Sequence, residues 1–311
     1  MLYRSPSDVR RGMGDSPLTN ERVYSSEETL NVSFDPLALR KVPTGIADLD
    51  SIVGGGFPEG SLVLLLGDIG AGTQEYVYTA ASKIAIVRKS PELRHYFLGP
   101  ACDDSVLPDR ICYVTFSRSR EAILQELGAS FNSEFFYAFR DLTTFRDFSA
   151  SYFRNSVIPS TWTQQENPFE ARSENVLEGL VAFLDENARG AMVVVDSLTD
   201  LVETEAVEMR DLVTTVKGLQ RASKEWGGIT YLLLTRGILD KRFEQMVVDS
   251  VDGCLTFEWR TYARSSNRQR YMYLEKFTSV LPHLPRDKIA RFPTMVTSNQ
   301  GLVVVYMERI A

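Results

Sequence analysis

The chain has 311 residues, of which 44% are hydrophobic, and its formal net charge is -7. This size and apolar content are typical of one large α/β domain or two small ones. The negative charge argues against general attraction to nucleic acid or to an anionic membrane. The cysteines, Cys102, Cys112 and Cys254, are few and widely spaced, which indicates neither a disulfide framework nor a metal knuckle.

Residues 1–40 are polar, rich in Ser, Pro, Glu and Arg, and without a clear period, so we expect a flexible N-terminal extension. We expect residues 41–311 to form a single domain. No apolar run approaches the ~20 residues that span a bilayer, and the first residues lack the apolar core of a signal peptide. These features and the free cysteines predict a cytoplasmic protein without membrane contact.

From Lys41 onward, strand-like and helix-like segments alternate, which predicts a mostly parallel sheet covered by helices on both faces. The apolar run Ser61–Gly67 predicts a buried central strand, and the segment after it has helical spacing. Residues 89–109 are expected to be a loop. Further along we expect a strand over Arg110–Ser117, a helix over Ser119–Ala129 and a third strand over Glu134–Leu142.

Residues 143–168 show little periodicity, and we expect irregular surface or a short helix there. Beyond them the pattern predicts a helix over Ser173–Ala188, a buried strand over Ala191–Asp196, a long amphipathic helix over Met209–Trp226 and a strand over Ile229–Gly237. From Asp252 the pattern changes to short strands separated by turns. These predict an antiparallel extension of the sheet, with strands over 253–260, 270–277, 291–297 and 301–307.

The segment Gly67–Tyr76, GDIGAGTQEY, follows the first central strand and resembles a Walker A phosphate-binding loop. In such a loop backbone N–H groups wrap the phosphates, a Lys reaches the outer phosphates and a Ser/Thr hydroxyl holds magnesium. Here the glycines remain, but Thr73 and Gln74 replace the Lys and the hydroxyl residue. The loop therefore lacks the charged half of the site, and phosphoryl transfer should suffer most from that loss.

Three hypotheses remain open for this loop: a glycine turn that only connects strand to helix, weak or altered nucleotide binding, and real turnover. If a ligand binds, ATP or ADP with magnesium is expected, held weakly. The candidate binding residues are those of the loop, together with one lysine of a late strand: Gly67, Asp68, Ile69, Gly70, Ala71, Gly72, Thr73, Gln74 and Lys276.

The longer segment PTGIADLDSIVGGGFPEGSLVLLLGDIGAG, residues 43–72, resembles the entry to the KaiC and RadA branch of the RecA superfamily of P-loop ATPases. The likeness includes a TG-x-x-x-LD element, a glycine-rich turn, the strand and the loop, and it extends over Lys41–Ala311. The resemblance implies a three-layer RecA-like α/β fold. The residues in register are Thr44, Gly45, Leu49, Asp50, Gly54, Gly55, Gly56 and Gly60.

By the same resemblance Asp196 is the Walker B carboxylate, a metal-supporting residue, although an Asp after three valines is also a good turn residue or helix cap. The family's Glu pair after the second strand corresponds to Ser117 and Arg118, and neither residue is a usable base. Glu121 is a weak catalytic candidate. Its alternative interpretation is an exposed acid in the first turn of a helix.

The family's K-x-R pattern on a late strand, which reaches the neighbouring subunit's nucleotide, keeps Lys276 but has Thr278 in place of Arg. The other interpretation of Lys276 is a solvated strand residue. The turn Arg260–Arg270 contains four arginines with no acidic neighbour in the sequence, and it predicts either a solvated hairpin tip or contact with single-stranded nucleic acid or an acidic partner.

The favoured hypothesis is a KaiC-like paralogue with a degenerate nucleotide site, which acts as a regulatory or scaffold protein through a protein partner. As a monomer or small homo-oligomer, it would bind ATP weakly or not at all. Two alternatives are kept: a slow ATPase using Asp196, Glu121 and a neighbour's Lys276, and a recombinase-like DNA-binding module using the Arg260–Arg270 turn.

Overall fold

The structure, a computed structural model, describes residues 39–154, 156–163, 175–204, 207–261 and 267–305. Residues 38–311 form one compact unit. The expected extension over residues 1–40 therefore lies almost wholly outside the described residues. Among those described, the chain begins with a small two-stranded sheet of β1 (Lys41–Val42) and β2 (Phe57–Pro58), which flanks helix α1 (Ala47–Val53).

A nine-stranded sheet forms the centre of the described chain, in the order β11-β10-β9-β8-β3-β7-β6-β4-β5. Strands β8, β3, β7, β6, β4 and β5 run parallel, whereas β9, β10 and β11 add antiparallel neighbours at one end. This confirms the predicted antiparallel extension. The strands are β3 (Ser61–Gly67), β4 (Ile111–Thr115), β5 (Thr143–Asp147), β6 (Met192–Asp196), β7 (Ile229–Thr235), β8 (Gly253–Thr261), β9 (Arg268–Phe277), β10 (Phe292–Thr297) and β11 (Gly301–Val304).

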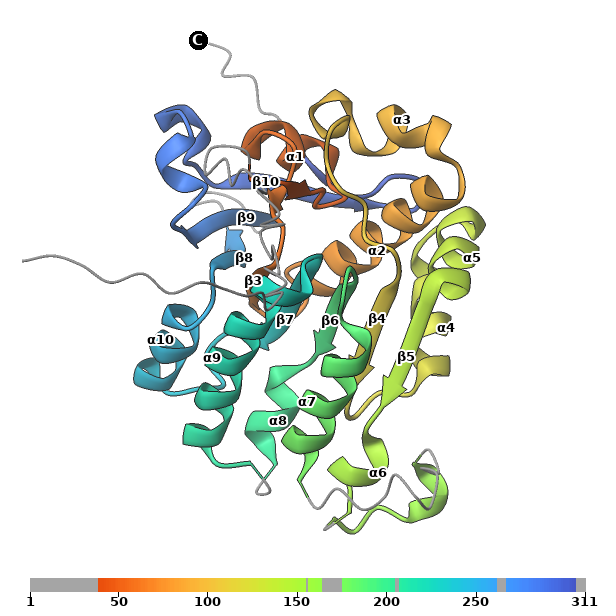
Figure 1. Ribbon diagram of the computed structural model, residues 1–311, viewed down its shortest axis with the longest axis vertical. Coiled ribbons are helices and arrows are strands. Elements are labelled where there is room, and N and C mark those ends of the chain that lie inside the picture. The colour runs from red at the N-terminus through yellow and green to blue at the C-terminus, as the bar shows by residue number, and fades with distance from the viewer. Residues whose placement is uncertain (1–38, 155, 164–174, 205–206, 262–266, 306–311) are drawn as a thin grey trace, which may run out of the picture. The chain divides into compact units, whose positions relative to one another are not determined.

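Helices cover both faces of this sheet, which makes three layers (Figure 1). Alternate residues of β3 point to opposite faces, so Val63 and Leu65 join one core while Leu62 and Leu64 join the other. The first core is covered by α1, α2 (Thr73–Lys89), α3 (Arg94–Leu98), α4 (Arg120–Ser130) and α5 (Ser133–Leu142). The second is covered by α7 (Val176–Asn187), α8 (Leu198–Glu203), α9 (Met209–Trp226) and α10 (Lys241–Asp249).

The prediction of a third strand over Glu134–Leu142 is wrong, because these residues form helix α5. The side chain of Asn132 caps this helix by accepting the N–H of Phe135 at 2.9 Å. Phe135 and Phe139 are four residues apart and share the buried face of the helix. The aromatic residues of this segment favour strands by composition, but the cap and the four-residue spacing favour a helix.

Two stretches expected to be irregular contain short elements. Residues 89–109 include α3 and two single 3₁₀ turns, Pro91–Leu93 and Pro100–Cys102. Within 143–168, residues 143–147 form the edge strand β5, followed by the short helix α6 (Ser149–Tyr152) and a 3₁₀ turn at Ser160–Trp162. Residues 164–168 of that stretch lie outside the described part of the chain.

The TG-x-x-x-LD element docks the start of the domain onto α2. The backbone N–H of Thr44 donates to Asp50 Oδ1 at 2.7 Å, within a fully buried turn. Gly45 has a φ of 78°, and a Cβ built on it would lie 2.6 Å from the Cα of Ala80 in α2. The motif therefore serves close packing against the helix that follows the glycine loop.

Candidate functional site

The candidate site lies at the carboxyl edge of the parallel strands. Gly67 at the end of β3 pairs with Thr235 of β7, and Thr115 of β4 pairs with Asp196 at the end of β6. The carboxyl ends of adjacent parallel strands are where open α/β sheets bind ligands. The glycine loop after β3 and Asp196 at the end of β6 therefore lie at the same edge of the sheet.

The glycine loop makes the expected connection between β3 and α2. Gly70 and Gly72 have φ angles of 70° and 124°, and the N–H of Ala71 donates to the carbonyl of Asp68 at 2.9 Å. A Cβ on Gly67 would lie 2.5 Å from the methyl carbon of Thr73, so Thr73 packs toward Gly67. The position that holds the lysine in a working loop is thus occupied by a short side chain that faces the loop itself.

Strand β8 holds the loop from the side. The N–H of Asp68 donates to the carbonyl of Phe257 at 3.0 Å, and the N–H of Trp259 donates to Asp68 Oδ2 at 3.0 Å. The indole Nε1 of Trp259 donates to the carbonyl of Ile69 at 3.1 Å. These three bonds tie the loop to strand β8.

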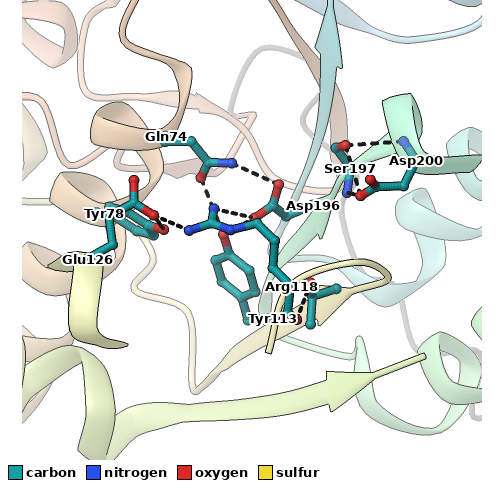
Figure 2. A network of polar contacts seen from close by, with 9 residues as sticks. Gln74, Tyr78, Tyr113, Arg118, Glu126, Asp196, Ser197 and Asp200 are labelled. Carbon is teal, nitrogen blue, oxygen red and sulfur yellow. Dashed lines mark hydrogen bonds and ion pairs between the residues drawn. The ribbon is translucent and has the colours of Figure 1, made fainter. Parts of the chain in front are cut away.

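Gln74 contacts the Walker B carboxylate directly. Its amide Nε2 donates to Asp196 Oδ1 at 2.8 Å, while its Oε1 lies 3.4 Å from the hydroxyl of Tyr113 (Figure 2). The same Tyr113 hydroxyl donates to Asp196 Oδ2 at 2.6 Å. Both oxygens of the carboxylate are therefore already bonded to side chains of the chain itself.

Arg118 adds a positive charge to this network. Its Nη1 lies 3.4 Å from Asp196 Oδ2, and its Nη2 pairs with Glu126 of α4 (Figure 2). Thr115 orients the segment, because its hydroxyl donates to the carbonyl of Arg118 at 2.8 Å. Tyr78 of α2 donates to the same Glu126 oxygen at 3.3 Å. Arg118 therefore places one positive charge between the carboxylates of Asp196 and Glu126.

The electrostatics agree with this geometry. Only 3% of Asp196 is exposed, and this burial raises the pKa of its carboxyl group. The hydrogen bond from Tyr113, the charge of Arg118 and the amide of Gln74 each lower that pKa and so oppose the effect of burial. Gln74, Tyr113 and Arg118 each direct a donor group at this carboxylate, so a cation at Asp196 would have to displace them. No cluster of three His, Cys, Asp or Glu side chains suited to a metal occurs in the described residues. The residues present do not fit the magnesium ion that the family resemblance implies.

The alternative interpretation of Asp196 as a helix cap is wrong, because Ser197 has that role. The hydroxyl of Ser197 accepts the N–H of Asp200 at 3.4 Å, and Asp200 Oδ2 accepts the N–H of Ser197 at 3.2 Å. This capping box starts helix α8 and leaves Asp196 as the last residue of β6.

The other candidates lie away from this carboxylate network. Glu121 lies in the first turn of α4, where 77% of its side chain is exposed and Arg120 lies 3.6 Å away, as expected for an exposed helix N-terminal acid. Ser117 and Thr278 are exposed. Lys276 is half-buried, and its ammonium donates to three carbonyls at and just beyond the end of α10, those of Val248, Asp249 and Val251, at 3.0, 2.8 and 2.7 Å.

The arginines of the 260–270 turn do have acidic neighbours, contrary to the sequence expectation. Arg260 pairs with Glu258 at 2.5 Å, and Arg270 pairs with Glu75 of α2 at 3.1 Å. Arg268 and Arg270 also stack on the ring of Trp259, at 4.4 and 4.9 Å from its centroid. Glu258 lies two residues before Arg260 on the same strand, just outside the turn, whereas Glu75 comes from α2 and could not be seen in the sequence of the turn. Arg264 and Tyr262 lie outside the described residues.

Sequence reasoning did not select Tyr113, Glu126 or Trp259, although all three contact the site. Tyr113 could have been selected, because it lies on β4, the strand that pairs with β6, and a tyrosine side chain there can reach the end of β6. The partners of Glu126 and Trp259 depend on tertiary packing and gave no local signal.

Comparisons with known proteins agree with the fold. No protein-family profile matches the chain. A KaiC-like protein of the hyperthermophilic archaeon Pyrococcus horikoshii is similar in structure, with a TM-score of 0.57 and 19% identity over 86% of this chain and 100% of that chain. The DNA repair protein RadA of Mycolicibacterium smegmatis is 42% identical over 53 residues, 17% of this chain and 11% of RadA.

These matches support a relationship to the KaiC and RadA branch of the RecA superfamily. The solved structure shares the fold across most of the chain, whereas the sequence match to RadA covers about a tenth of that protein. Among the described residues, no helix is long and apolar enough to span a bilayer.

Proposed function

We propose that this chain is a KaiC-like protein whose nucleotide site is closed by its own side chains, and that it acts as a regulatory or scaffold protein through a protein partner. The observation that supports the proposal is the set of bonds from Gln74, Tyr113 and Arg118 to Asp196. They give both oxygens of the Asp196 carboxylate donors from the chain itself.

Hydrolysis requires a base and charge neutralisation at the outer phosphates. Ser117 and Arg118 supply no base, and the exposed Glu121 pairs with its neighbour instead of facing the loop. The charge of Arg118 is shared between Asp196 and Glu126. We therefore infer that the protein does not turn over ATP.

Binding should also be weak. Charge-assisted hydrogen bonds are about twice as strong as neutral ones, and Thr73 supplies no charge to a triphosphate. The amides of the loop would still offer a neutral cradle at the start of α2. We infer weak, metal-independent binding of ATP or ADP at most.

Calorimetry of the full chain with ATP and with ADP, each with and without magnesium, tests the proposal. The matched variant restores the family residues as Thr73→Lys, Gln74→Thr and Arg118→Glu together. We expect the native chain to bind weakly without regard to magnesium, and the triple variant to bind tighter with magnesium. Tight magnesium-dependent binding by the native chain, or ATP turnover abolished by Asp196→Ala, would contradict the proposal.

The two alternatives have less support. A slow ATPase needs Lys276 to reach a neighbour's nucleotide, but that ammonium is bonded within its own chain. A DNA-binding module needs free arginines, but Arg260 and Arg270 are paired with glutamates. DNA repair belongs to the name of the RadA relative, whose matched segment is short. Binding of single-stranded DNA that weakens steeply with salt and is lost in Arg268→Ala would favour that module.

A further inference from the structure

A second pocket lies on the α2 side of the sheet, between α1, α2, α3 and the last two strands. Its volume is about 480 Å³, within the size range of small-molecule sites. Ile46, Phe97 and Leu302 form an apolar wall, and all three are at most 8% exposed. Two charged side chains, Asp48 and Lys83, also line it.

Lys83 is unusual among the lysines of the described chain because only 7% of it is exposed. No hydrogen bond or ion pair between described residues involves its ammonium. Burial lowers the pKa of Lys83 to about 8, and the charges of Asp48 and Asp50 oppose that shift. Its ammonium faces the pocket without an acceptor among the described residues, so an acceptor that enters the pocket would gain a charge-assisted contact.

Asp48 provides the opposite charge. Its Oδ2 accepts the N–H of Val304 at 3.3 Å, which holds the carboxylate at the wall of the pocket. Its charge raises the pKa of Lys83, yet the two side chains form no ion pair with each other within the described residues. The pocket thus presents one cation and one anion that are near each other but not joined.

Asp50 limits the charge of a ligand. It is fully buried, its Oδ2 has no hydrogen-bond partner, and its charge acts on Lys83. With two carboxylates acting on one ammonium, a ligand that brings only negative charge would be repelled. A ligand with one carboxylate and one ammonium adds no net charge and offers a partner to each side chain.

We propose that this pocket binds a free α-amino acid with an apolar side chain. Its carboxylate accepts from Lys83, its ammonium donates to Asp48, and its side chain lies along the apolar side of the pocket beside Phe97. The site is separate from the glycine loop and does not depend on the function proposed for it.

Ligand-observed NMR titration of the full chain tests this site, with L-leucine, L-phenylalanine and L-methionine as probes. The N-acetyl derivative of each lacks the ammonium and the amide derivative lacks the carboxylate. The variants are Lys83→Met and Asp48→Asn, and Lys217→Met on the exposed face of α9 is the matched control. Lys83→Met removes an unpaired buried charge, so thermal melting should show a fold at least as stable as the native one.

We expect at least one of the three amino acids to bind saturably, and both derivatives of it to bind about tenfold more weakly or worse. Lys83→Met and Asp48→Asn should each weaken binding by about tenfold, whereas Lys217→Met should leave it unchanged. Equal binding of either derivative, unchanged binding by Lys83→Met, or no saturable binding of any probe at millimolar concentration would overturn the proposal.

Discussion

The guanidinium of Arg118 lies 3.4 Å from the carboxylate of Asp196, at the place where relatives with a Walker site are expected to have an acidic base and a metal. An arginine at this position does two things at once. It cannot act as a base, and it supplies a fixed positive charge to the buried carboxylate. The chemistry available at this edge of the sheet and the stability of Asp196 are therefore linked through one side chain.

Removal of Arg118 should destabilise the fold. In Arg118→Ala the buried Asp196 keeps its hydrogen bonds but loses its cation, which should cost about 2 kcal/mol or more of unfolding free energy. Asp196→Asn removes the charge that needs the cation. The loss of unfolding free energy in the double variant should therefore be about 1 kcal/mol smaller than the sum of the losses in the two single variants, measured by urea denaturation. Strict additivity would show that the two side chains do not interact.

Lys276 should act on stability alone. Lys276→Met removes three hydrogen bonds to the carbonyls at the end of α10, and with them a cation at a helix C-terminus. We expect a loss of about 1–2 kcal/mol. Lys217→Met on an exposed helix face should change stability by less than about 0.5 kcal/mol. An unchanged melting temperature in Lys276→Met, with altered oligomer size by light scattering, would instead support a role toward a neighbouring subunit.

Lys83 should make stability depend on alkaline pH. Its pKa is about 8 in the fold and 10.5 in its unperturbed state, so the native chain binds fewer protons than the unfolded chain between these values. Stability should therefore rise as pH increases from about 8 toward about 10, by at most about 3 kcal/mol. The charges of Asp48 and Asp50 act on the ammonium and partly oppose the lowering of its pKa by burial.

Tyrosines also titrate at alkaline pH, but they are present in both the native chain and Lys83→Met. The difference in urea midpoint between these two chains therefore isolates the contribution of Lys83. The advantage of Lys83→Met should be largest near neutral pH and shrink as pH rises. A difference that stays constant from about pH 7 to about pH 10 would mean that the lysine keeps an ordinary pKa in the fold.

Gly45 should be intolerant of a side chain. In Gly45→Ala the new Cβ would lie 2.6 Å from backbone of α2, at a φ of 78°, so we expect a loss of at least about 2 kcal/mol. Gly218→Ala is the control, since Gly218 lies inside helix α9 with open space around it. That change should stabilise the fold by about 0.5–1 kcal/mol in thermal or urea unfolding. Equal effects of the two substitutions would show that the TG element does not pack as described.

Much of the fold could be predicted from local patterns. The unbroken apolar run of β3 and the amphipathic spacing of α9 are properties of short segments, and both elements form as expected. Helix α5 was missed because its aromatic composition favours strands, while the Asn132 cap and the packing of its Phe side chains favour a helix. Local preference and tertiary packing disagree there, and packing decides.

The site was only partly predictable, for a similar reason. The loop and Asp196 were identified by pattern, but the contact between Gln74 and Asp196 joins residues 122 positions apart. The function of Lys276 depends on carbonyls 25 to 28 positions earlier in the chain. A replaced residue type shows what a site has lost, whereas its new partners are visible only in three dimensions.

The shared contact of Gln74, Tyr113 and Arg118 with one carboxylate also constrains how this sequence can evolve. If Gln74 or Arg118 alone reverted to the residue type of an active relative, Asp196 would lose a donor before a magnesium ion had a complete set of ligands. Each such single substitution would therefore lower stability. Gln74, Tyr113 and Arg118 are thus expected to change together, because each of them contacts the same buried carboxylate.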